Sequence, residues 1–439
     1  MALRAALCCS AMLLTAAPLP EDAASAESDQ LQPAVARAIP DDPFLQPTFH
    51  LVLRNHSQLI HQQDASGNLF LDGVWHWFID CTDGGQSLIW CHLLSEDLRN
   101  WRWAASPLVT GQGGDTGSIA VTSEGIYLFV PGCGGICRRV ALDRTLNSWG
   151  PTSAAISSPH PRNFRDPARP FRGADGHWYI IVGSGLTAGE TCALTPNVTG
   201  PVAQALMYRA SDATLAHWEF VSALWSARTT VRGVSVDTFE CPDIWPLDED
   251  GTVVFEGSMC SDTCEPPLCG PTPVFGRWNG HSEEYWVGKV NATANSLEVS
   301  SHGVFDYGNY YCSKTAAAEH QVGSRRVLFG WIHPLTNNRG NGTDEWQANV
   351  TGWGQSPEAL PREVTGPEAD GELRFAPVQE LEALRDARSS TNVSETLRCG
   401  DRIPIMAGHQ LELRATFSWS GVTLLQQAVR NRLFCAISY

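Results

Sequence analysis

The feature that most constrains the fold of this chain is a short unit that recurs five times along it. In each unit a turn leads into a run of aromatic and β-branched residues, and the units begin near residues 72, 124, 175, 250 and 325. Four of the turns are an acidic residue followed by glycine; Asp-Gly between strand-like runs is a strong hairpin signal. Repeating β units of about 40–50 residues are typical of propeller blades with four strands each. The sequence therefore predicts an all-β chain built on a five-bladed β-propeller, with an irregular β-sandwich as the alternative.

Three carboxylates occupy the same place in three of these units. Asp64, Asp166 and Glu240 stand eight to ten residues before the turn of their unit. Equivalent positions in a radial repeat face one axis, so we expect the three side chains to meet in a central pocket. Two carboxylates flanking one bond are what glycoside cleavage needs, because one donates a proton while the other attacks or activates water. Taken singly, each of the three could instead be a turn residue or a surface charge.

Other residues in these units keep two interpretations. Trp75 and Trp90 could stack on a sugar ring or fill the core, since indole faces suit both places. His92 could line the pocket or cap a turn. Asp115 could add an acid to the pocket, although a plain turn is favoured for the glycine-rich segment around it. Tyr311 could reach the pocket from the fifth unit.

Composition and charge exclude one class of partner and indicate another. The net charge of −17 is the opposite of the basic footprint of a nucleic-acid-binding protein, so we expect none. The N-terminus resembles a signal peptide over residues 1–26, with Arg4 before a short apolar run and a cleavage site at residues 24–26, or at 15–17 as the alternative. That run is too short to span a bilayer, so we expect no membrane association after cleavage. Six Asn-x-Ser/Thr sequons also favour a secreted or vacuolar product: Asn55, Asn197, Asn291, Asn341, Asn349 and Asn392.

Cysteine usage favours disulfides over a metal site. Fourteen cysteines are present, and twelve follow the expected signal peptide. The spacing of Cys133 and Cys137, and of Cys260, Cys264 and Cys269, could suit a metal, but no histidine is close and secreted chains form disulfides. We therefore expect neither a metal nor another cofactor. Cys241 is expected to be a buried unpaired thiol beside Glu240, with a disulfide as the alternative.

Six segments, in this order, carry a family resemblance: residues 63–67, 90–98, 165–167, 240–241, 306–315 and 360–362. They resemble the motifs of glycoside hydrolase family 32, the invertases and fructan hydrolases, over roughly residues 45–415. Arg-Asp-Pro and Glu-Cys are identical to the family's motifs. Residues 306–315 are similar to its Asp-Tyr-Gly-x-x-Tyr-Ala-x-Lys-Thr.

The resemblance implies a role for each carboxylate. Asp64 would be the nucleophile, Asp166 would stabilise the transition state and hold fructosyl hydroxyls, and Glu240 would be the acid/base. The segment around Asp64 departs from the family's Asn-Asp-Pro-Asn-Gly, and Asp80 stands about where the family has glutamine, so these differences fall in the fructosyl pocket that the resemblance implies. The residues expected to contact substrate are Gln63, Asp80, Trp90, Arg165, Cys241 and Tyr307.

The family's propeller is followed by a β-sandwich, and here that second domain is expected to be incomplete. Residues 378–385 predict a short linker helix and residues 409–417 alternate like a strand. Only about thirty residues follow, whereas a two-sheet sandwich commonly takes ~100. The expected organisation is a signal peptide over 1–26, a catalytic propeller over 45–365, and a linker helix with a partial sandwich over 366–439.

The chemistry of the three carboxylates and the resemblance together predict a secreted, retaining β-fructofuranosidase. One carboxyl protonates the leaving oxygen and an ionised one attacks the anomeric carbon, as cleavage through an oxocarbenium-like transition state requires. Its partner would be a small carbohydrate, sucrose or a fructan. The alternatives are a fructosyltransferase, a non-catalytic fructan-binding protein, and an arabinofuranosidase or xylosidase on the same kind of propeller.

Overall fold

The computed structural model describes residues 12–15, 51, 53–55, 58–59, 62–82, 88–105, 116–159, 163–173, 175–231, 234–260, 282–291, 295–306, 310–317, 324–332, 358–368, 371–385, 394 and 435–438. The chain divides into two compact units, one made of Met1–Thr48 with Leu384–Tyr439 and the other of Phe49–Ala383. Of the first unit, the described part is chiefly a parallel pair of short strands, β1 (Met12–Thr15) and β30 (Cys435–Ser438). The second unit holds the predicted propeller.

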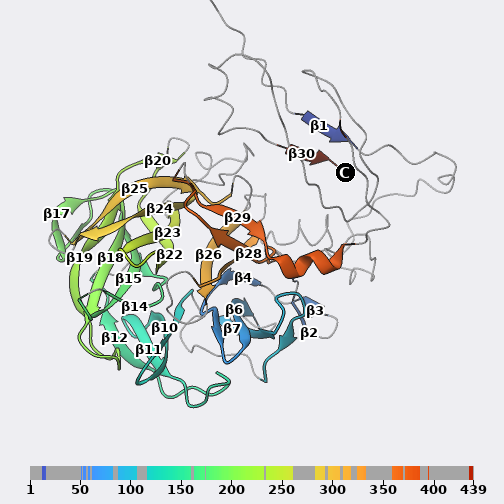
Figure 1. The fold of residues 1–439 in the computed structure, drawn as a ribbon. Coiled ribbons are helices and arrows are strands. Elements are labelled where there is room, and N and C mark those ends of the chain that lie inside the picture. The colour runs from blue at the N-terminus through green and yellow to red at the C-terminus, as the bar shows by residue number, and fades with distance from the viewer. Residues whose placement is uncertain are drawn as a thin grey trace, which may run out of the picture. The chain divides into compact units, whose positions relative to one another are not determined.

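Five antiparallel sheets form the blades, in sequence order around the ring (Figure 1). Blade A contains β4 (Gln62–Ala65), β6 (Val74–Thr82), β7 (Leu88–Ser95) and β8 (Arg102–Trp103), with β5 (Leu69–Leu71) also paired to β6. Blade B contains β9 (Ser118–Thr122), β10 (Gly125–Gly132), β11 (Gly135–Val140) and β12 (Ser153–Ser157). Blade C contains β13 (Phe164–Arg165), β15 (Trp178–Leu186), β18 (Val202–Ala210) and β19 (Glu219–Ala227), with β14 (Phe171–Arg172) also paired to β15.

Blades D and E complete the ring. Blade D contains β22 (Thr238–Pro246), β23 (Thr252–Cys260), β24 (Ser282–Asn291) and β25 (Ser296–Val304). Blade E contains β26 (Tyr310–Ala317), β27 (Arg326–Ile332), β28 (Arg362–Thr365) and β29 (Arg374–Pro377). The last blade therefore continues past residue 365, the end expected for the propeller. The five-bladed arrangement predicted from the repeat is confirmed.

The Asp-Gly hairpin predicted in the first sequence repeat is also confirmed. Asp72 and Gly73 connect β5 to β6, and both have positive φ, 51° and 84°. A two-residue hairpin with both central residues in the left-handed region is a type I′ turn, whose twist matches that of the flanking strands. Glycine adopts this conformation without strain, and aspartate tolerates it better than most residues. The sequence Asp-Gly thus fixes the register of the first hairpin.

The ring closes because the second strand of each blade sends neighbouring residues to opposite faces, as the two-residue period of a strand requires. Each interface between blades is then filled from both sides, and the pairs across the five interfaces are Phe78 with Leu128, Phe129 with Ile180, Ile181 with Phe255, Val254 with Leu328, and Phe329 with Trp77. All ten side chains are fully buried. Burying a large apolar side chain stabilises a fold by about 1.5–3 kcal/mol, and the interface between the first and last blades buries such a pair as the other four do.

Three innermost strands carry a β-bulge near the middle of the ring. The register shifts between Gln62 and Ala65 on β4, between Glu240 and Asp243 on β22, and between Tyr311 and Lys314 on β26. A bulge bends its strand and re-aims the side chains beside it. Asp64 lies within the first bulge and Glu240 at the edge of the second, so the bulges fall where the candidate site lies.

The remaining elements are short. Three two-stranded hairpins join β2 (Arg54–Asn55) to β3 (Gln58–Leu59), β16 (Thr191–Cys192) to β17 (Thr195–Thr199), and β20 (Thr230–Val231) to β21 (Val234–Ser235). A 3-10 helix, η1 (Gln379–Leu384), follows blade E where a short helix was expected. Within the described ranges, no helix has the length and apolar character needed to cross a membrane. The strand expected at 409–417 lies outside the described residues, and of the sandwich expected after the short helix the structure describes only residue 394 and β30.

Candidate active site

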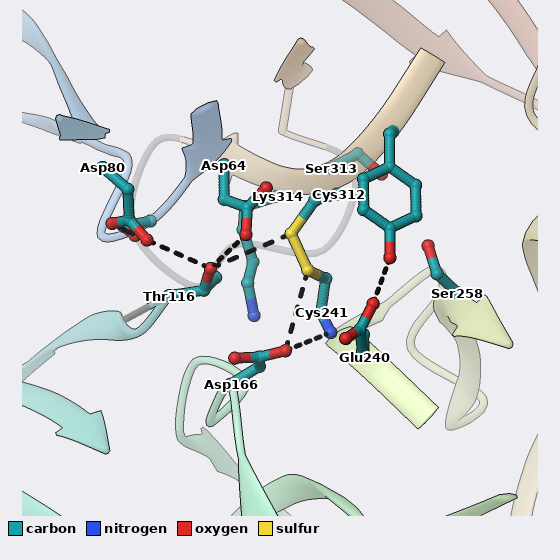
Figure 2. The surroundings of a disulfide bond; sticks show 12 residues. Asp64, Asp80, Thr116, Asp166, Glu240, Cys241, Ser258, Cys312, Ser313 and Lys314 are labelled. Carbon is teal, nitrogen blue, oxygen red and sulfur yellow. Dashed lines mark hydrogen bonds between the residues drawn. A yellow bond between two sulfur atoms is a disulfide. The ribbon is translucent and has the colours of Figure 1, made fainter. Parts of the chain in front are cut away.

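The three carboxylates converge, each at or next to an innermost strand of its blade. Asp64 lies on β4, Asp166 directly follows β13, and Glu240 lies on β22. Figure 2 shows the three side chains gathered around the disulfide between Cys241 and Cys312. Glu240 is near enough to both aspartates for its negative charge to raise their pKa values. The equivalent placement read from the sequence repeat thus brings the three groups into one site.

Asp64 receives one hydrogen bond on each carboxylate oxygen. Thr116 Oγ1 donates to Oδ2 at 2.8 Å, and Trp331 Nε1 donates to Oδ1 at 2.7 Å. Although part of its surface is exposed, burial among protein atoms raises the pKa of Asp64 to about 6, and Glu240 adds to that rise while the two donors oppose it. Asp64 is therefore a carboxylate oriented by two hydrogen bonds, and it ionises near pH 6.

Asp166 is more enclosed, with 4% of its surface exposed. Its Oδ2 accepts a hydrogen bond from the backbone N–H of Cys241 at 3.0 Å. Its backbone φ is 56°, an uncommon value for a residue other than glycine. Burial raises the pKa of Asp166 to about 7, and the positive charge of Arg165 partly opposes that rise.

Glu240 is held between a cation and a phenol. Arg165 Nη2 donates to Oε1 at 2.5 Å, and the Tyr311 hydroxyl donates to Oε2. Arg165 Nε also lies 4.0 Å from Oδ2 of Asp166. One guanidinium thus approaches two of the carboxylates, and of these two it donates a hydrogen bond to Glu240; its Nη1 donates to Asn163 Oδ1 at 3.2 Å. Burial, together with the neighbouring charge of Glu240, raises the pKa of the Tyr311 phenol well above its usual range, so this phenol stays protonated as a donor.

A buried lysine lies close to the same groups (Figure 2). Lys314 Nζ donates to the carbonyl of Pro242 at 2.6 Å and contacts that of Pro167 at 3.5 Å, which ties together the chain just after Glu240 and just after Asp166. Burial lowers the pKa of Lys314, while the carboxylates nearby, Asp243 foremost, oppose that change.

The residues expected to contact substrate have different fates. Arg165 reaches the carboxylates, and Gln63 lies beside Asp64 with part of its surface exposed. Asp80 is fully buried, where it accepts a hydrogen bond from Ser66 Oγ at 2.7 Å and lies 3.3 Å from Thr116 Oγ1. It can therefore act on a ligand only through other residues. Tyr307 lies outside the described residues.

Two of these expectations need correction. Trp90 is fully buried in the core between blades A and B, where its ring packs near Phe78, so it has no surface for a sugar. Cys241 is not an unpaired thiol, because it forms a disulfide with Cys312 and is itself 1% exposed. Its contribution to the site is its backbone N–H rather than its sulfur.

The alternatives left open for other residues are also settled, except that Asp115 lies outside the described residues. Trp75 belongs to the core between blades A and E. His92 neither lines the pocket nor caps a turn, since it is buried and shares a hydrogen bond of 2.8 Å with His76 on the neighbouring strand. Tyr311 does reach the carboxylates.

Sequence reasoning missed both donors to Asp64. Thr116 lies eight residues before the turn at Glu124, the same offset that separates Asp64 from Asp72. That offset could have singled it out, but attention to charged groups selected the neighbouring Asp115. Trp331 comes from the second strand of the fifth blade, 267 residues from its partner, and no local pattern distinguishes it from the core tryptophans.

Disulfides and a single cluster of possible metal ligands bear on metal binding in the described part of the chain. Cys81 pairs with Cys91, Cys133 with Cys137, and Cys241 with Cys312. The sulfurs of Cys241 and Cys312 lie within 4.8 Å of each other and of a carboxylate oxygen of Asp64. Because these sulfurs are bonded to each other, they offer no thiolate to a metal. This trio therefore does not fit a metal site.

Comparisons with known proteins agree with this architecture. Residues 58–377 match the model of the Glycosyl hydrolases family 32 N-terminal domain. An insoluble β-fructofuranosidase isoenzyme 2 of Oryza sativa is 26% identical over 73% of this chain and 54% of its own length. A sucrose:sucrose 1-fructosyltransferase of Festuca arundinacea is 26% identical over 84% of this chain and 56% of its own length. The chain thus spans about half the length of these curated relatives.

A solved structure supports the fold. Fructan 1-exohydrolase IIa from Cichorium intybus superposes with a TM-score of 0.58 and 20% identity, covering 78% of this chain and 63% of the other. The sequence motifs, the ring of five blades and the match over residues 58–377 agree with one another. This chain belongs to glycosyl hydrolase family 32.

Proposed function

We propose that this protein is a retaining β-fructofuranosidase that hydrolyses sucrose or a fructan through a covalent fructosyl-enzyme intermediate. The observation that carries the proposal is the convergence of Asp64, Asp166 and Glu240, each with a different set of partners. Retaining glycosidases need one carboxylate that attacks and one carboxyl group that donates and then removes a proton. Groups with different surroundings suit such a division of labour.

Asp64 is the proposed nucleophile. Two donors fix its carboxylate, which limits the motion that would otherwise have to be frozen when it attacks. Its pKa of about 6 leaves it ionised above that pH. The attack needs the ionised form, so the rate is expected to rise as the pH rises through about 6.

Glu240 is the proposed acid/base, and Asp166 the group that holds sugar hydroxyls near the developing positive charge. Tyr311 and Arg165 both contact Glu240, so its carboxyl group is oriented before a substrate arrives. Asp166 keeps Oδ2 on the N–H of Cys241, which leaves its other oxygen for a sugar hydroxyl. Gln63, Arg165 and Tyr307 are proposed to contact the substrate, and Asp80 to act on it through Thr116.

A fructosyltransferase is the second candidate. The same intermediate would be intercepted by a sugar instead of water, and the Festuca relative is named for that reaction. The segment around Asp64, with Gln63 before it and Ala65 after it, differs from the motif that the family resemblance describes. Product analysis at high sucrose concentration separates the two, because transfer yields trisaccharides and hydrolysis yields free fructose.

The secretory pathway is the proposed location. Disulfides persist in oxidising compartments and are rare in the cytosol, and three are present among the described residues. The N-terminal signal peptide and the sequons read from the sequence favour the same route.

The test is a panel of sucrose, inulin, levan and an arabinofuranoside, assayed with the wild type and with Asp64→Asn. We expect the wild type to release fructose from at least one of the first three and nothing from the fourth, and Asp64→Asn to be nearly inactive. Asp72→Asn is the matched control, because this exposed turn residue lies in the same repeat and pairs with Arg144 at the surface. NMR of the first-formed fructose should show the anomer of the substrate. Activity in Asp64→Asn, or the opposite anomer, contradicts the mechanism.

A further inference from the structure

We infer that the Cys241–Cys312 disulfide is a positioning element that holds all three carboxylates of the site in one arrangement. The inference rests on the proposed function for its kinetic consequences. It goes beyond the roles of the carboxylates themselves, because it concerns a covalent link between blades D and E that touches none of the reacting atoms.

The link joins two bulges. Cys241 directly follows Glu240 in the bulge of β22, and Cys312 directly follows Tyr311 in the bulge of β26. Both cysteines have positive φ, 50° and 44°. Residues other than glycine adopt this region at a cost, and they keep it where the surrounding structure over-determines it. A covalent bond between the two bulges provides that constraint.

Each of the three carboxylates accepts a hydrogen bond from Cys241 itself or from a residue beside the disulfide. The N–H of Cys241 donates to Asp166 at 3.0 Å. Tyr311, next to Cys312, donates from its hydroxyl to Glu240. Trp331 packs with Tyr311 and the two cysteines in one buried cluster, and its indole N–H donates to Asp64 at 2.7 Å.

The cluster is buried enough to transmit position. Cys241 is 1% exposed, Cys312 is fully buried, and Tyr311 and Trp331 are 8% and 7% exposed. Close-packed interiors have little room to deform, so a displaced side chain moves its neighbours. Separating the bulges would shift the donors of Asp64, Asp166 and Glu240 together.

Noncovalent contacts hold the same bulge as well, and they make the inference testable. Glu283 accepts hydrogen bonds from the backbone N–H of Ser313 at 2.8 Å and from its hydroxyl at 2.7 Å, and Lys314 donates to the carbonyl of Pro242 at 2.6 Å. If these contacts alone fix the bulge, removing the disulfide leaves the carboxylates in place. If the disulfide fixes it, catalysis falls while the blades remain folded.

The experiment uses Cys312→Ala, which leaves Cys241 as a thiol. Alanine is the residue that the family motif resembled by residues 306–315 has at this place, so the substitution is compatible with the fold. We expect kcat on sucrose, or on whichever fructoside the wild type cleaves best, to fall about 10- to 100-fold, the usual result of a misplacement near 1 Å. We expect KM to change less than about threefold. The matched control is Cys133→Ala with Cys137→Ala, which removes a disulfide of blade B outside the site and should leave both constants unchanged.

A second readout does not need turnover. Trp331 donates to Asp64, so its fluorescence should report protonation of that carboxylate, and subtracting the signal of Trp331→Phe isolates it from the other tryptophans. In the wild type the transition is expected near pH 6. In Cys312→Ala we expect its midpoint to fall by half a pH unit or more, because a loosened cluster admits water and weakens the effect of burial.

The outcomes separate the two proposals. A wild type that cleaves no fructoside ends the proposed function, and the fluorescence titration then decides the positioning inference alone. Peptide mapping without reductant must recover the Cys241–Cys312 link, and its absence overturns the inference. Unchanged kcat with an unchanged fluorescence midpoint in Cys312→Ala also overturns it. A lower melting temperature with both readouts unchanged assigns the disulfide to stability only, which overturns it as well.

Discussion

Arg165 donates its Nη2 hydrogen bond to Glu240 at 2.5 Å and not to Asp166, the next residue in the chain. Its nearest approach to the carboxylate of Asp166 is 4.0 Å. The sequence predicted that Arg165 contacts the substrate. In the fold it lies between the proposed acid/base and the proposed hydroxyl-binding group, so one cation acts on both.

Replacing Arg165 with lysine should therefore impair catalysis, although the substitution keeps the positive charge. Lysine keeps the charge but loses the planar fork that reaches Glu240 and Asp166 together. Hydrogen bonds to charged groups contribute about 1.5–3 kcal/mol, so we expect kcat/KM to fall roughly 10- to 150-fold in steady-state assays. Arg209→Lys, which alters an exposed pair with Glu219 on blade C, is the control and should behave as wild type.

Replacing Glu240 with glutamine removes the proposed proton donor while keeping its shape. We expect the rate on sucrose to fall by about 10²–10⁴, the usual contribution of acid–base catalysis. A fructoside with a better leaving group needs less protonation, so its rate of fructosyl transfer to the enzyme should fall less. Pre-steady-state release of the leaving group from both substrates measures this. An equal loss on both would show that Glu240 only binds or orients.

Thr116→Val should move the acidic limb of the pH–rate profile to higher pH. The hydroxyl of Thr116 lowers the pKa of Asp64 by donating to its ionised form, and valine has nearly the same shape without that donor. A higher pKa means that Asp64 becomes ionised, and thus nucleophilic, only at a higher pH. The profile of kcat/KM against pH checks this, because it reports groups of the free enzyme. Thr122→Val, which removes a hydroxyl bonded to the carbonyl of Ala213, should leave the limb in place.

Asp64→Asn should stabilise the fold at neutral pH while abolishing turnover. The folded-state pKa of Asp64 is about 6, above its unfolded value of 3.8, so folding binds protons between these values and stability falls as the pH rises through them. Asparagine does not ionise, so the variant should have a free energy of unfolding roughly 1–3 kcal/mol above that of the wild type above pH 6. This difference should vanish near pH 4. Urea unfolding at pH 4 and pH 8 measures it.

The control for that measurement has the opposite sign. Arg144 lowers the pKa of Asp72, so this carboxylate stabilises the fold above its unfolded pKa. Asp72→Asn should therefore be slightly less stable than wild type at pH 8 and equal to it at low pH. If both asparagine variants shift in the same direction, burial of Asp64 does not control its charge.

The His76–His92 pair should make blade A sensitive to acid. Burial lowers the pKa of His76 to about 4 and that of His92 to about 3, so both are neutral in the folded protein. The unfolded chain binds protons at these two histidines below about pH 6.5. The free energy of unfolding therefore falls as the pH drops from 6.5 towards 4. His92→Gln removes one of the two groups and should flatten the fall of the urea midpoint across this range. An identical pH dependence in the variant would contradict this account.

The repeat and the carboxylates could be predicted because each depends on local sequence. A two-residue turn, an alternating strand and a fixed offset from turn to carboxylate are visible within one unit, and radial symmetry then places equivalent positions at one axis. Asp64, Asp166 and Glu240 follow from that logic. The same logic would also have identified Thr116, because its offset from the turn equals that of Asp64.

The rest depends on contacts between units, which no local pattern encodes. Cys241 and Cys312 are 71 residues apart, and nothing near either one identifies the other as its partner. Trp90 and Trp331 are similar in sequence as tryptophans on strands, yet one fills a core while the other binds the proposed nucleophile. The packing of each blade face against its neighbour decides whether such a tryptophan fills the core or contacts the carboxylates.

The hydrogen bond from Trp331 to Asp64 has a consequence for synthesis. A ribosome adds about 5–20 residues per second, so the 267 residues between these positions take on the order of 10 to 50 s. Until blade E emerges, Asp64 lacks the indole donor of Trp331, and the apolar edge that carries Trp77 lacks the Phe329 that will cover it. The nascent chain therefore needs protection from aggregation at its first blade, and the proposed nucleophile has both of its hydrogen-bond donors only when the last blade has been made.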